Sequence, residues 1–181
     1  IEDTAQAIGS DYTFSNGTTA KAGTIGTFGT TSFFPSKNLG CYGDGGAIFT
    51  NNDDLADKAR MIANHGQSKQ YVHDRIGCNS RLDAIQAAVL RIKLRHLDDY
   101  ATRRQAVANK YDTAFAETEK IRTPARDPNS THVFHQYTMV LNGVDRNELR
   151  DYLSTQGIPA MIYYPIPLHG QKAFENARFN E

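Results

Sequence analysis

The stretch Thr30-Thr-Ser-Phe-Phe-Pro-Ser-Lys-Asn-Leu-Gly-Cys-Tyr-Gly-Asp-Gly-Gly46 decides how this sequence is interpreted. It places one lysine, Lys37, between an aromatic run typical of a buried strand and a loop with four glycines in seven residues. Glycines let backbone amides approach a phosphate, but neither of the two common nucleotide-binding glycine patterns occurs. From the residues alone, a phosphate-binding loop and a surface turn with a solvated lysine both remain open.

Around this stretch, the sequence predicts short strands followed by helices. Short apolar runs predict buried strands at Thr24–Phe28, Ser32–Phe34 and Ala47–Thr50. From Asn52 the apolar residues repeat with helical spacing up to Gly66, which predicts an amphipathic helix with an Asn or Asp cap and a glycine stop. A second apolar stripe over Leu82–Phe115 predicts a helix of about ten turns that is long enough to bridge two domains.

Beyond Pro124 the pattern changes to strand, helix, strand. The expected elements are a strand at His132–Leu141, a helix at Asp145–Gln156 and a strand at Ile158–Tyr164. We therefore expect an α/β protein in which residues 1–95 end a large domain, and residues 96–181 form the bridging helix and a small α+β domain.

Composition excludes several classes of function. The 181 residues contain 20 Lys and Arg against 20 Asp and Glu, so no overall positive field exists to attract nucleic acid or a membrane surface. Two cysteines give neither a zinc site nor a disulfide framework, and no membrane span or signal peptide is evident. We expect a cytoplasmic protein, and because the chain starts without methionine we expect a fragment of a longer one.

Three motifs in order resemble the DegT/DnrJ/StrS family of sugar aminotransferases. They are Ile1-Glu-Asp-Thr-Ala-Gln-Ala7, the Ser32–Gly46 part of the stretch quoted above, and Gly77-Cys-Asn-Ser-Arg-Leu-Asp-Ala-Ile-Gln-Ala-Ala88. The resemblance covers essentially the whole chain and is closest to the WbpE-like branch. It implies the C-terminal half of a fold-type-I enzyme that uses pyridoxal 5'-phosphate, paired as a homodimer.

The resemblance gives Lys37 and Asp3 catalytic and cofactor-binding roles. Transamination needs an amine that bonds to the cofactor aldehyde and then moves a proton, and lysine can do both. A carboxylate beside the pyridine nitrogen keeps that nitrogen protonated, which matches Asp3. The alternative for Asp3 is a side chain that caps the end of a strand.

Three further residues match cofactor-binding positions of the family. Gln6 resembles the glutamine at the cofactor ring, Ser32 the phosphate-binding serine, and Asn79 the asparagine that reaches the partner chain's cofactor phosphate. The alternatives are a glutamine on a helix surface, an ordinary strand serine, and an asparagine that caps the long helix.

Substrate binding is assigned by the same resemblance. Arg81 is suited to bind a carboxylate through both guanidinium nitrogens, or it pairs with a nearby acid such as Asp83. Tyr163, Tyr164 and His169 lie in a segment that approaches the sugar nucleotide in the family, with ordinary packing as the alternative. No metal site is expected, because His132 and His135 would lie on opposite faces of a strand.

The expected reaction moves an amino group, from glutamate by resemblance, to a nucleotide-linked keto sugar. UDP-2-acetamido-3-keto-glucuronate is the expected substrate, in surface polysaccharide or lipopolysaccharide biosynthesis. A dehydratase of the same family would carry histidine in place of Lys37. A non-catalytic sugar-nucleotide-binding or regulatory relative with the same fold is the alternative from another class.

Overall fold

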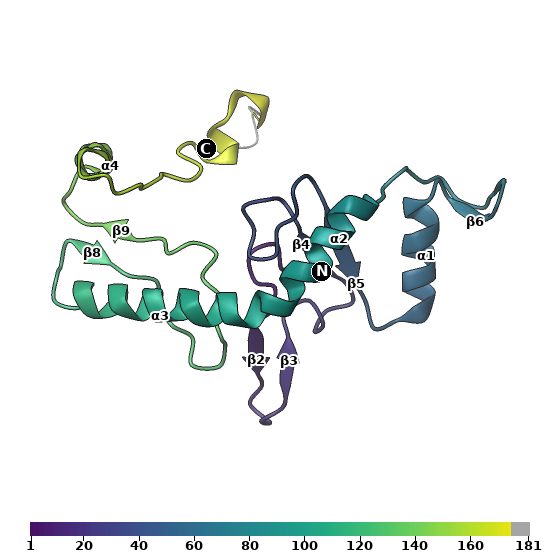
Figure 1. The fold of residues 1–181 in the computed structure, drawn as a ribbon, viewed down its shortest axis with the longest axis horizontal. Coiled ribbons are helices and arrows are strands. Elements are labelled where there is room, and N and C mark those ends of the chain that lie inside the picture. Colours follow the sequence, from purple (N-terminus) through teal and green to yellow (C-terminus); the bar gives the residue numbers. More distant parts are fainter. Residues whose placement is uncertain (175–181) are drawn as a thin grey trace. The chain divides into compact units, whose positions relative to one another are not determined.

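The computed structural model describes residues 1–174, which divide into two compact units (Figure 1). Unit 1 contains residues 1–118 and 123–139, and unit 2 contains residues 119–122 and the described residues from 140 onward. The boundary therefore differs from the one expected at residue 95, because helix α3 (Leu97–Phe115) groups with unit 1. The assignment of the units to a large cofactor-binding domain and a small domain stays a prediction.

A three-stranded sheet carries the N-terminal part of unit 1. Its order is β1 (Glu2–Asp3), β4 (Gly29–Ser32) and β5 (Gly46–Phe49), with β1 parallel and β5 antiparallel to β4. The expected strand at Ala47–Thr50 is confirmed as β5, shifted by one residue, whereas only Ser32 of the expected strand at Ser32–Phe34 lies in a strand, at the end of β4.

The strand expected at Thr24–Phe28 is wrong. This segment is a turn in which the backbone amides of Gly23, Ile25 and Gly26 donate hydrogen bonds to the carboxylate of Glu2. Those amide bonds, led by the one from Gly26, lower the pKa of the Glu2 carboxyl. Amides that bind a carboxylate are not available to a β-ladder, so the apolar pattern of the segment does not produce a strand.

Two hairpins extend from unit 1. The first pairs β2 (Asp11–Thr13) with β3 (Thr19–Lys21), and the second pairs β6 (Gln67–Lys69) with β7 (Val72–His73), both antiparallel. The β2 strand also makes an isolated bridge to Ser130, which attaches the hairpin to the later part of the unit.

The helix expected after Asn52 is confirmed as α1 (Asp53–Ala63). The Asn52 side chain accepts a hydrogen bond from the Leu55 amide at 3.0 Å, as an N-cap residue does. Gly66 follows the helix with φ of 75°, and an added Cβ would lie 1.8 Å from the carbonyl oxygen of Arg75, so a larger residue has no room.

The helix expected over Leu82–Phe115 is interrupted. It forms α2 (Ala84–Lys93), a 3₁₀ turn η1 (Leu94–His96) and α3, and Figure 1 shows α2 and α3 inclined to one another. His96 leaves the helical conformation with φ of −110° and ψ of 2°. No helix among residues 1–174 is long and apolar enough to cross a membrane.

The core of unit 1 lies between the loop of Lys37 and the junction of α2 with α3. Its buried members are Phe33, Leu39, Cys41, Leu90 and Leu97, with Ile8 and Ala47 packed against them. The aromatic run thus divides: one phenylalanine fills this core and the next is half exposed.

Unit 2 is a small α+β element. It pairs β8 (Ile121–Arg122) with β9 (Val140–Leu141) and contains α4 (Arg146–Thr155), followed by the 3₁₀ turns η2 (Leu168–Gly170) and η3 (Lys172–Phe174). The helix expected from Asp145 is confirmed, because the Asp145 carboxylate caps it by accepting two backbone N–H bonds.

The two strands expected in this region are mostly wrong. Only Val140–Leu141 of the expected His132–Leu141 strand is extended in a ladder. The segment Ile158–Tyr164 forms no strand, and within the described residues no neighbouring strand pairs with it. Apolar alternation alone does not supply the partner that a strand requires.

Replacing Leu97 with alanine should lower the free energy of unfolding by about 2–5 kcal/mol, because a buried leucine leaves a cavity. Leu97 is 8% exposed, whereas Leu94 is 56% exposed on the same helical segment and serves as the matched control. Leu94→Ala should cost less than about 1 kcal/mol. Urea denaturation followed by circular dichroism measures both, and equal losses would contradict the described core.

Candidate functional site

The loop of Lys37 is fixed by backbone bonds and by two close-packed glycines. The Lys37 amide donates to the Phe34 carbonyl at 2.9 Å. A Cβ on Gly40 would lie 2.5 Å from the Pro35 carbonyl oxygen, and one on Gly45 would lie 2.9 Å from a Leu82 methyl group. These two glycines therefore serve close packing within the loop, which the glycine pattern alone did not distinguish from phosphate binding.

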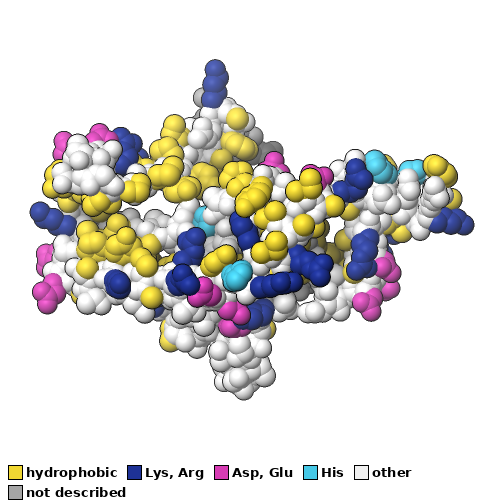
Figure 2. All heavy atoms as spheres, in the orientation of Figure 1, with side chains coloured by type: hydrophobic (Ala, Val, Ile, Leu, Met, Phe, Trp, Pro, Cys, Tyr) yellow, Lys and Arg dark blue, Asp and Glu magenta, His cyan; other side chains and the backbone are white. Residues whose placement is uncertain are grey.

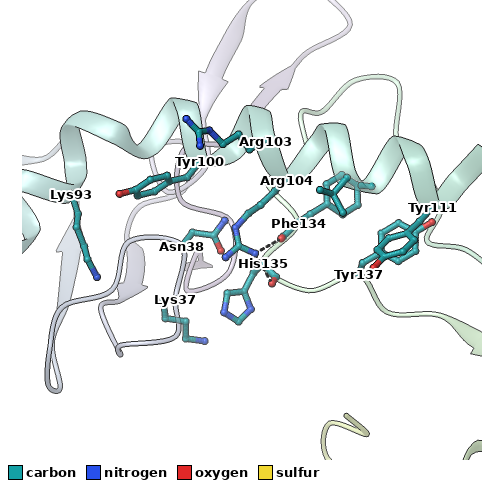
Figure 3. Close-up of a pocket in the computed structure, with 12 residues that line it drawn as sticks. Lys37, Asn38, Lys93, Tyr100, Arg103, Arg104, Tyr111, Phe134, His135 and Tyr137 are labelled. Atoms are coloured by element: carbon teal, nitrogen blue, oxygen red, sulfur yellow. Dashed lines mark hydrogen bonds between the residues drawn. The ribbon is translucent and has the colours of Figure 1, made fainter. Parts of the chain in front are cut away.

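Lys37 itself is half-buried and lines a cavity of about 590 Å³ between its loop, α3 and residues 134–137 (Figure 3). Its side chain therefore faces a cavity, and its catalytic role stays a prediction. The cavity is lined by Lys37, Asn38, Lys93, Tyr100, Arg103, Arg104, Val107, Ala108, Tyr111, Phe134, His135 and Tyr137. Four of these side chains are basic and none is acidic, so the cavity favours an anionic ligand.

The positive charge extends outside the cavity. Figure 2 shows Lys and Arg side chains gathered along α2 and α3 on the face turned to the viewer, with a few acidic side chains between them. One of the basic side chains of the cavity, Arg103, pairs with Asp99 on the same helix at 3.0 Å. Lys93 donates to the Gly40 carbonyl at 2.6 Å, which ties α2 to the loop of Lys37.

Four consecutive backbone carbonyls, of residues 132–135, accept hydrogen bonds from side chains; we call them the carbonyl row, and its last two residues line the cavity. Gln105 donates to the first carbonyl at 2.9 Å, and Asn38 to the second at 3.1 Å. Arg104 donates to the third and the fourth at 2.9 and 3.0 Å. Since these carbonyls bind side chains, they do not form the ladder of the strand that the sequence predicts here.

Phe134, in the middle of the carbonyl row, has a strained backbone. Its φ is 43°, in the left-handed region that a bulky residue rarely adopts. Its amide donates to His132 Nδ1 at 2.9 Å, and the guanidinium of Arg126 lies 4.3 Å from the centre of its ring. Strain of this kind persists where the surroundings hold it, and it concentrates at functional sites.

The end of this segment is fixed by Tyr137. Its hydroxyl donates to Asp112 on α3, and Arg126 also binds the same carboxylate. The Tyr137 bond is the main cause that lowers the pKa of Asp112. Burial, followed by the bond to Asp112, raises the pKa of Tyr137 to about 12.

His135 lies beside Lys37 and lines two cavities. Its Nε2 lies 2.9 Å from the carbonyl oxygen of Ser36, while its Nδ1 is buried without a partner. Burial is the main cause that lowers the pKa of His135, the bond to Ser36 opposes it, and the charges of Lys37 and Arg104 add to the lowering. The neutral ring is therefore the favoured form at pH 7.

The second cavity, of about 260 Å³, brings Asp3 and Gln6 together with His135. Asp3 Oδ1 accepts a hydrogen bond from the Ala5 amide at 3.0 Å, so the capping alternative for Asp3 holds for one of its oxygens. The other oxygen has no partner among residues 1–174. Gln6 lies in a turn and is exposed, so it is not a helix-surface residue.

Ser32, Asn79 and Arg81 line neither of these two cavities. Ser32 Oγ accepts a bond from the Phe34 amide at 3.2 Å, and Asn79 Oδ1 accepts one from Arg81 Nε at 2.9 Å. Asn79 does not cap the long helix, because α2 begins after Asp83. Within the described residues Arg81 forms no ion pair, so its pairing with an acid is not observed.

Tyr163, Tyr164 and His169 belong to unit 2. The two tyrosines are 51% and 79% exposed, with ring centres 6.2 Å apart, and the histidine lies in η2. High exposure argues against the alternative of ordinary packing for the tyrosines within this unit. No group of His, Cys, Asp and Glu side chains in residues 1–174 is arranged to bind a metal ion.

Sequence reasoning missed Asn38 and Arg104 and considered His135 only as a metal ligand. A signal for Arg104 was present, since it stands between Tyr100 and the buried Ala108 at four-residue spacing on α3. An arginine within an apolar helical stripe needs a buried partner, here the carbonyl row. Nothing in the sequence near Asn38 indicates that it binds a carbonyl 95 positions away.

Comparison with known proteins gives a consistent result. The family model described as "DegT/DnrJ/EryC1/StrS aminotransferase family" matches residues 1–181. A "Pleiotropic regulatory protein" of Geobacillus stearothermophilus is 46% identical over 100% of this chain and 47% of its own length. The "UDP-2-acetamido-2-deoxy-3-oxo-D-glucuronate aminotransferase" of Pseudomonas aeruginosa is 44% identical over 96% of this chain and 46% of its own length.

Solved structures agree with this match. A DegT DnrJ EryC1 StrS aminotransferase from Brucella abortus superposes with a TM-score of 0.85 at 42% identity, over 95% of this chain and 44% of that one. The fold-type-I α/β architecture is thereby confirmed. Other matching relatives are named as transaminases of dTDP-linked amino sugars. The chain spans about half the length of the relatives it matches.

Tyr137→Phe should lower the free energy of unfolding at pH 7 by about 1–3 kcal/mol, because it removes a hydrogen bond to a charged carboxylate. The folded-state pKa of Tyr137 is raised to about 12. Because the folded-state pKa is raised, Tyr137 contributes fully to the free energy of unfolding below the unfolded-state pKa of about 10. This contribution is lost as the pH rises to about 12. The difference between wild type and variant should shrink over that range in urea titrations.

Tyr111→Phe is the matched control for this measurement. Tyr111 stacks on Phe115 in α3, and its hydroxyl makes no hydrogen bond within residues 1–174. At pH 7 its effect on the free energy of unfolding should be smaller than that of Tyr137→Phe. A Tyr137→Phe effect that stays constant from pH 7 to pH 12 would contradict the assigned bond.

Proposed function

Because the chain belongs to the DegT/DnrJ/EryC1/StrS aminotransferase family, we propose that it forms the lysine-bearing half of an enzyme that transfers an amino group to a nucleotide-linked keto sugar. One observation carries the proposal: Lys37 lines one cavity, Asp3 and Gln6 line the next, and His135 lines both. In this proposal residues 1–95 end the large domain, and residues 96–181 supply the bridging helix and the small domain.

The residues present fit pyridoxal 5'-phosphate, on which enzymes of this family depend. Asn38 Oδ1 and His135 Nδ1 are buried polar atoms without partners, which indicates a polar ligand at this place. Lys37, which is half-buried, and the free oxygen of Asp3 would supply the nucleophile and the carboxylate that the cofactor needs. When bound, the cofactor supplies the electron sink for the reaction.

Each side chain then has a defined task. Lys37 would hold the cofactor through Nζ, and Nζ would carry a proton during the exchange with an amino donor. Asp3 holds its negative charge against the pyridine nitrogen and keeps that nitrogen protonated. Its bond from the Ala5 amide orients the carboxylate for this contact.

The remaining cofactor contacts come from three polar side chains. Gln6 contacts the cofactor ring, and the Ser32 hydroxyl donates to the phosphate, since its own proton has no acceptor within the described residues. Asn79 contacts the cofactor phosphate of the partner subunit, which makes the protein a homodimer with shared sites.

For the substrate we propose UDP-2-acetamido-3-keto-glucuronate, with glutamate as amino donor, in surface polysaccharide synthesis in the cytoplasm. The Pseudomonas relative named for this sugar supports it, while relatives named for dTDP sugars support the wider class. Arg81 would bind the sugar carboxylate, with Tyr163, Tyr164 and His169 against the sugar nucleotide. These four residues are proposed to determine the substrate specificity.

A second candidate is a regulatory protein that keeps the fold without turnover. The relative named "Pleiotropic regulatory protein" favours it. This candidate does not require Lys37 to react, whereas the aminotransferase does.

Lys37→Ala in the full-length protein should reduce transamination by at least about a thousandfold, because the covalent attachment and the proton carrier are both lost. It should also abolish trapping of the cofactor on this residue by borohydride. Mass spectrometry of the peptide that contains residue 37 measures the trapping. Lys58→Ala, on the exposed face of α1, is the matched control and should leave both unchanged.

Asp3→Asn tests the carboxylate separately. Asparagine keeps an oxygen for the Ala5 amide but carries no charge, so the fold and borohydride trapping should persist. Turnover should fall by roughly a hundredfold, because the pyridine nitrogen is no longer held protonated. If Asp3→Asn turned over as fast as wild type at equal cofactor occupancy, Asp3 would have no role in the reaction.

A further inference from the structure

His135 contains a buried hydrogen-bonding atom that has no partner among residues 1–174. Its Nε2 lies 2.9 Å from the Ser36 carbonyl oxygen, which can only accept, so Nε2 carries the proton. In the neutral ring Nδ1 is then a bare acceptor, and it is buried without a donor. An unpaired buried acceptor costs free energy, so its retention at this place calls for a donor from outside the chain.

The ring stays neutral mainly because it is buried. Burial is the largest cause that lowers the pKa of His135, the bond to Ser36 opposes it, and the charges of Lys37 on the loop and Arg104 on α3 add to the lowering. Asp3 lines the same second cavity but is not among the groups that shift the pKa of the His135 ring. Nδ1 is therefore an acceptor, not a proton donor, at neutral pH.

His135 is also held in place more firmly than a loop residue usually is. Arg104 fixes its carbonyl at 3.0 Å, and the carbonyls on either side of the strained Phe134 are bound by side chains from α3 and from the loop of Lys37. The ring is thus fixed at the place where the Lys37 cavity and the Asp3 cavity meet (Figure 3). Fixed acceptors at such a place orient a ligand efficiently.

We propose that His135 is a further substrate-binding residue of this site, whose Nδ1 accepts a hydrogen bond from an O–H or N–H group of a substrate. The inference rests on the proposed function. Two substrates carry such donors: the sugar has ring hydroxyls, and the amino acid has an ammonium group. Arg104 is a positioning residue that holds the backbone of His135.

Two substitutions separate this role from a structural one. The His135→Gln side chain reaches the position of Nε2 and keeps the bond to Ser36, but it leaves no acceptor at the position of Nδ1. The His135→Asn side chain does the reverse, since its amide oxygen occupies the position of Nδ1. If His135 only holds the loop through Ser36, the glutamine variant should react faster than the asparagine variant. If Nδ1 binds substrate, the asparagine variant should react faster.

The test uses the full-length protein with cofactor bound, and it follows the two half-reactions separately by the cofactor's visible absorbance. His135→Gln should slow one half-reaction by about tenfold, the effect of one lost hydrogen bond, and His135→Asn should restore most of that rate. Slowing of the sugar half-reaction identifies a hydroxyl donor, and slowing of the amino-acid half-reaction identifies the ammonium group.

Calorimetry gives a readout that does not depend on turnover. UDP-N-acetylglucosaminuronic acid and 2-methylglutamate serve as unreactive probes, and one of the two should bind about tenfold more weakly to His135→Gln than to wild type. Three results would each overturn the inference. They are unchanged rates and affinities, equal slowing of both half-reactions, and a glutamine variant that reacts faster than the asparagine variant. A wild-type protein without transamination would instead overturn the proposed function.

Discussion

Four backbone carbonyls that bind side chains instead of a neighbouring strand hold the site of this protein together. Gln105 and Arg104 come from α3, and Asn38 comes from the loop of Lys37, so one short segment joins two elements far apart in the chain. Each such bond contributes about 1 kcal/mol or more, and together they offset the strain at Phe134. The row fixes the backbone of His135 beside Lys37, and the bond of its ring to the Ser36 carbonyl fixes the side chain.

The residues around the carbonyl row also determine the charge of the Lys37 cavity. The basic side chains of the Lys37 cavity attract a negatively charged ligand, while Arg104 also uses its donors to bind backbone oxygens and is therefore held rigidly. Burial and these charges keep His135 neutral.

Local signals in the sequence predicted the structure correctly where neighbouring residues form the hydrogen bonds that an element needs. Asn52 and Asp145 cap their helices with their own side chains, and both helices lie where the spacing placed them. Segments that depend on distant partners were predicted wrongly. The Glu2 carboxylate accepts hydrogen bonds from backbone amides within the segment Thr24–Phe28, which therefore forms no strand. The carbonyl row occupies part of the expected strand at His132–Leu141.

The sequence by itself determined the family, the two capped helices and the identity of Lys37 as the reactive candidate, because motif order and capping are properties of neighbouring residues. Only the tertiary structure decided that Lys37 and His135 line one cavity, that Asp3 and Gln6 line the next, and that Arg104 faces inward. The physical reason is that these relations depend on hydrogen bonds and burial between residues 30 to about 130 positions apart, which no local pattern encodes.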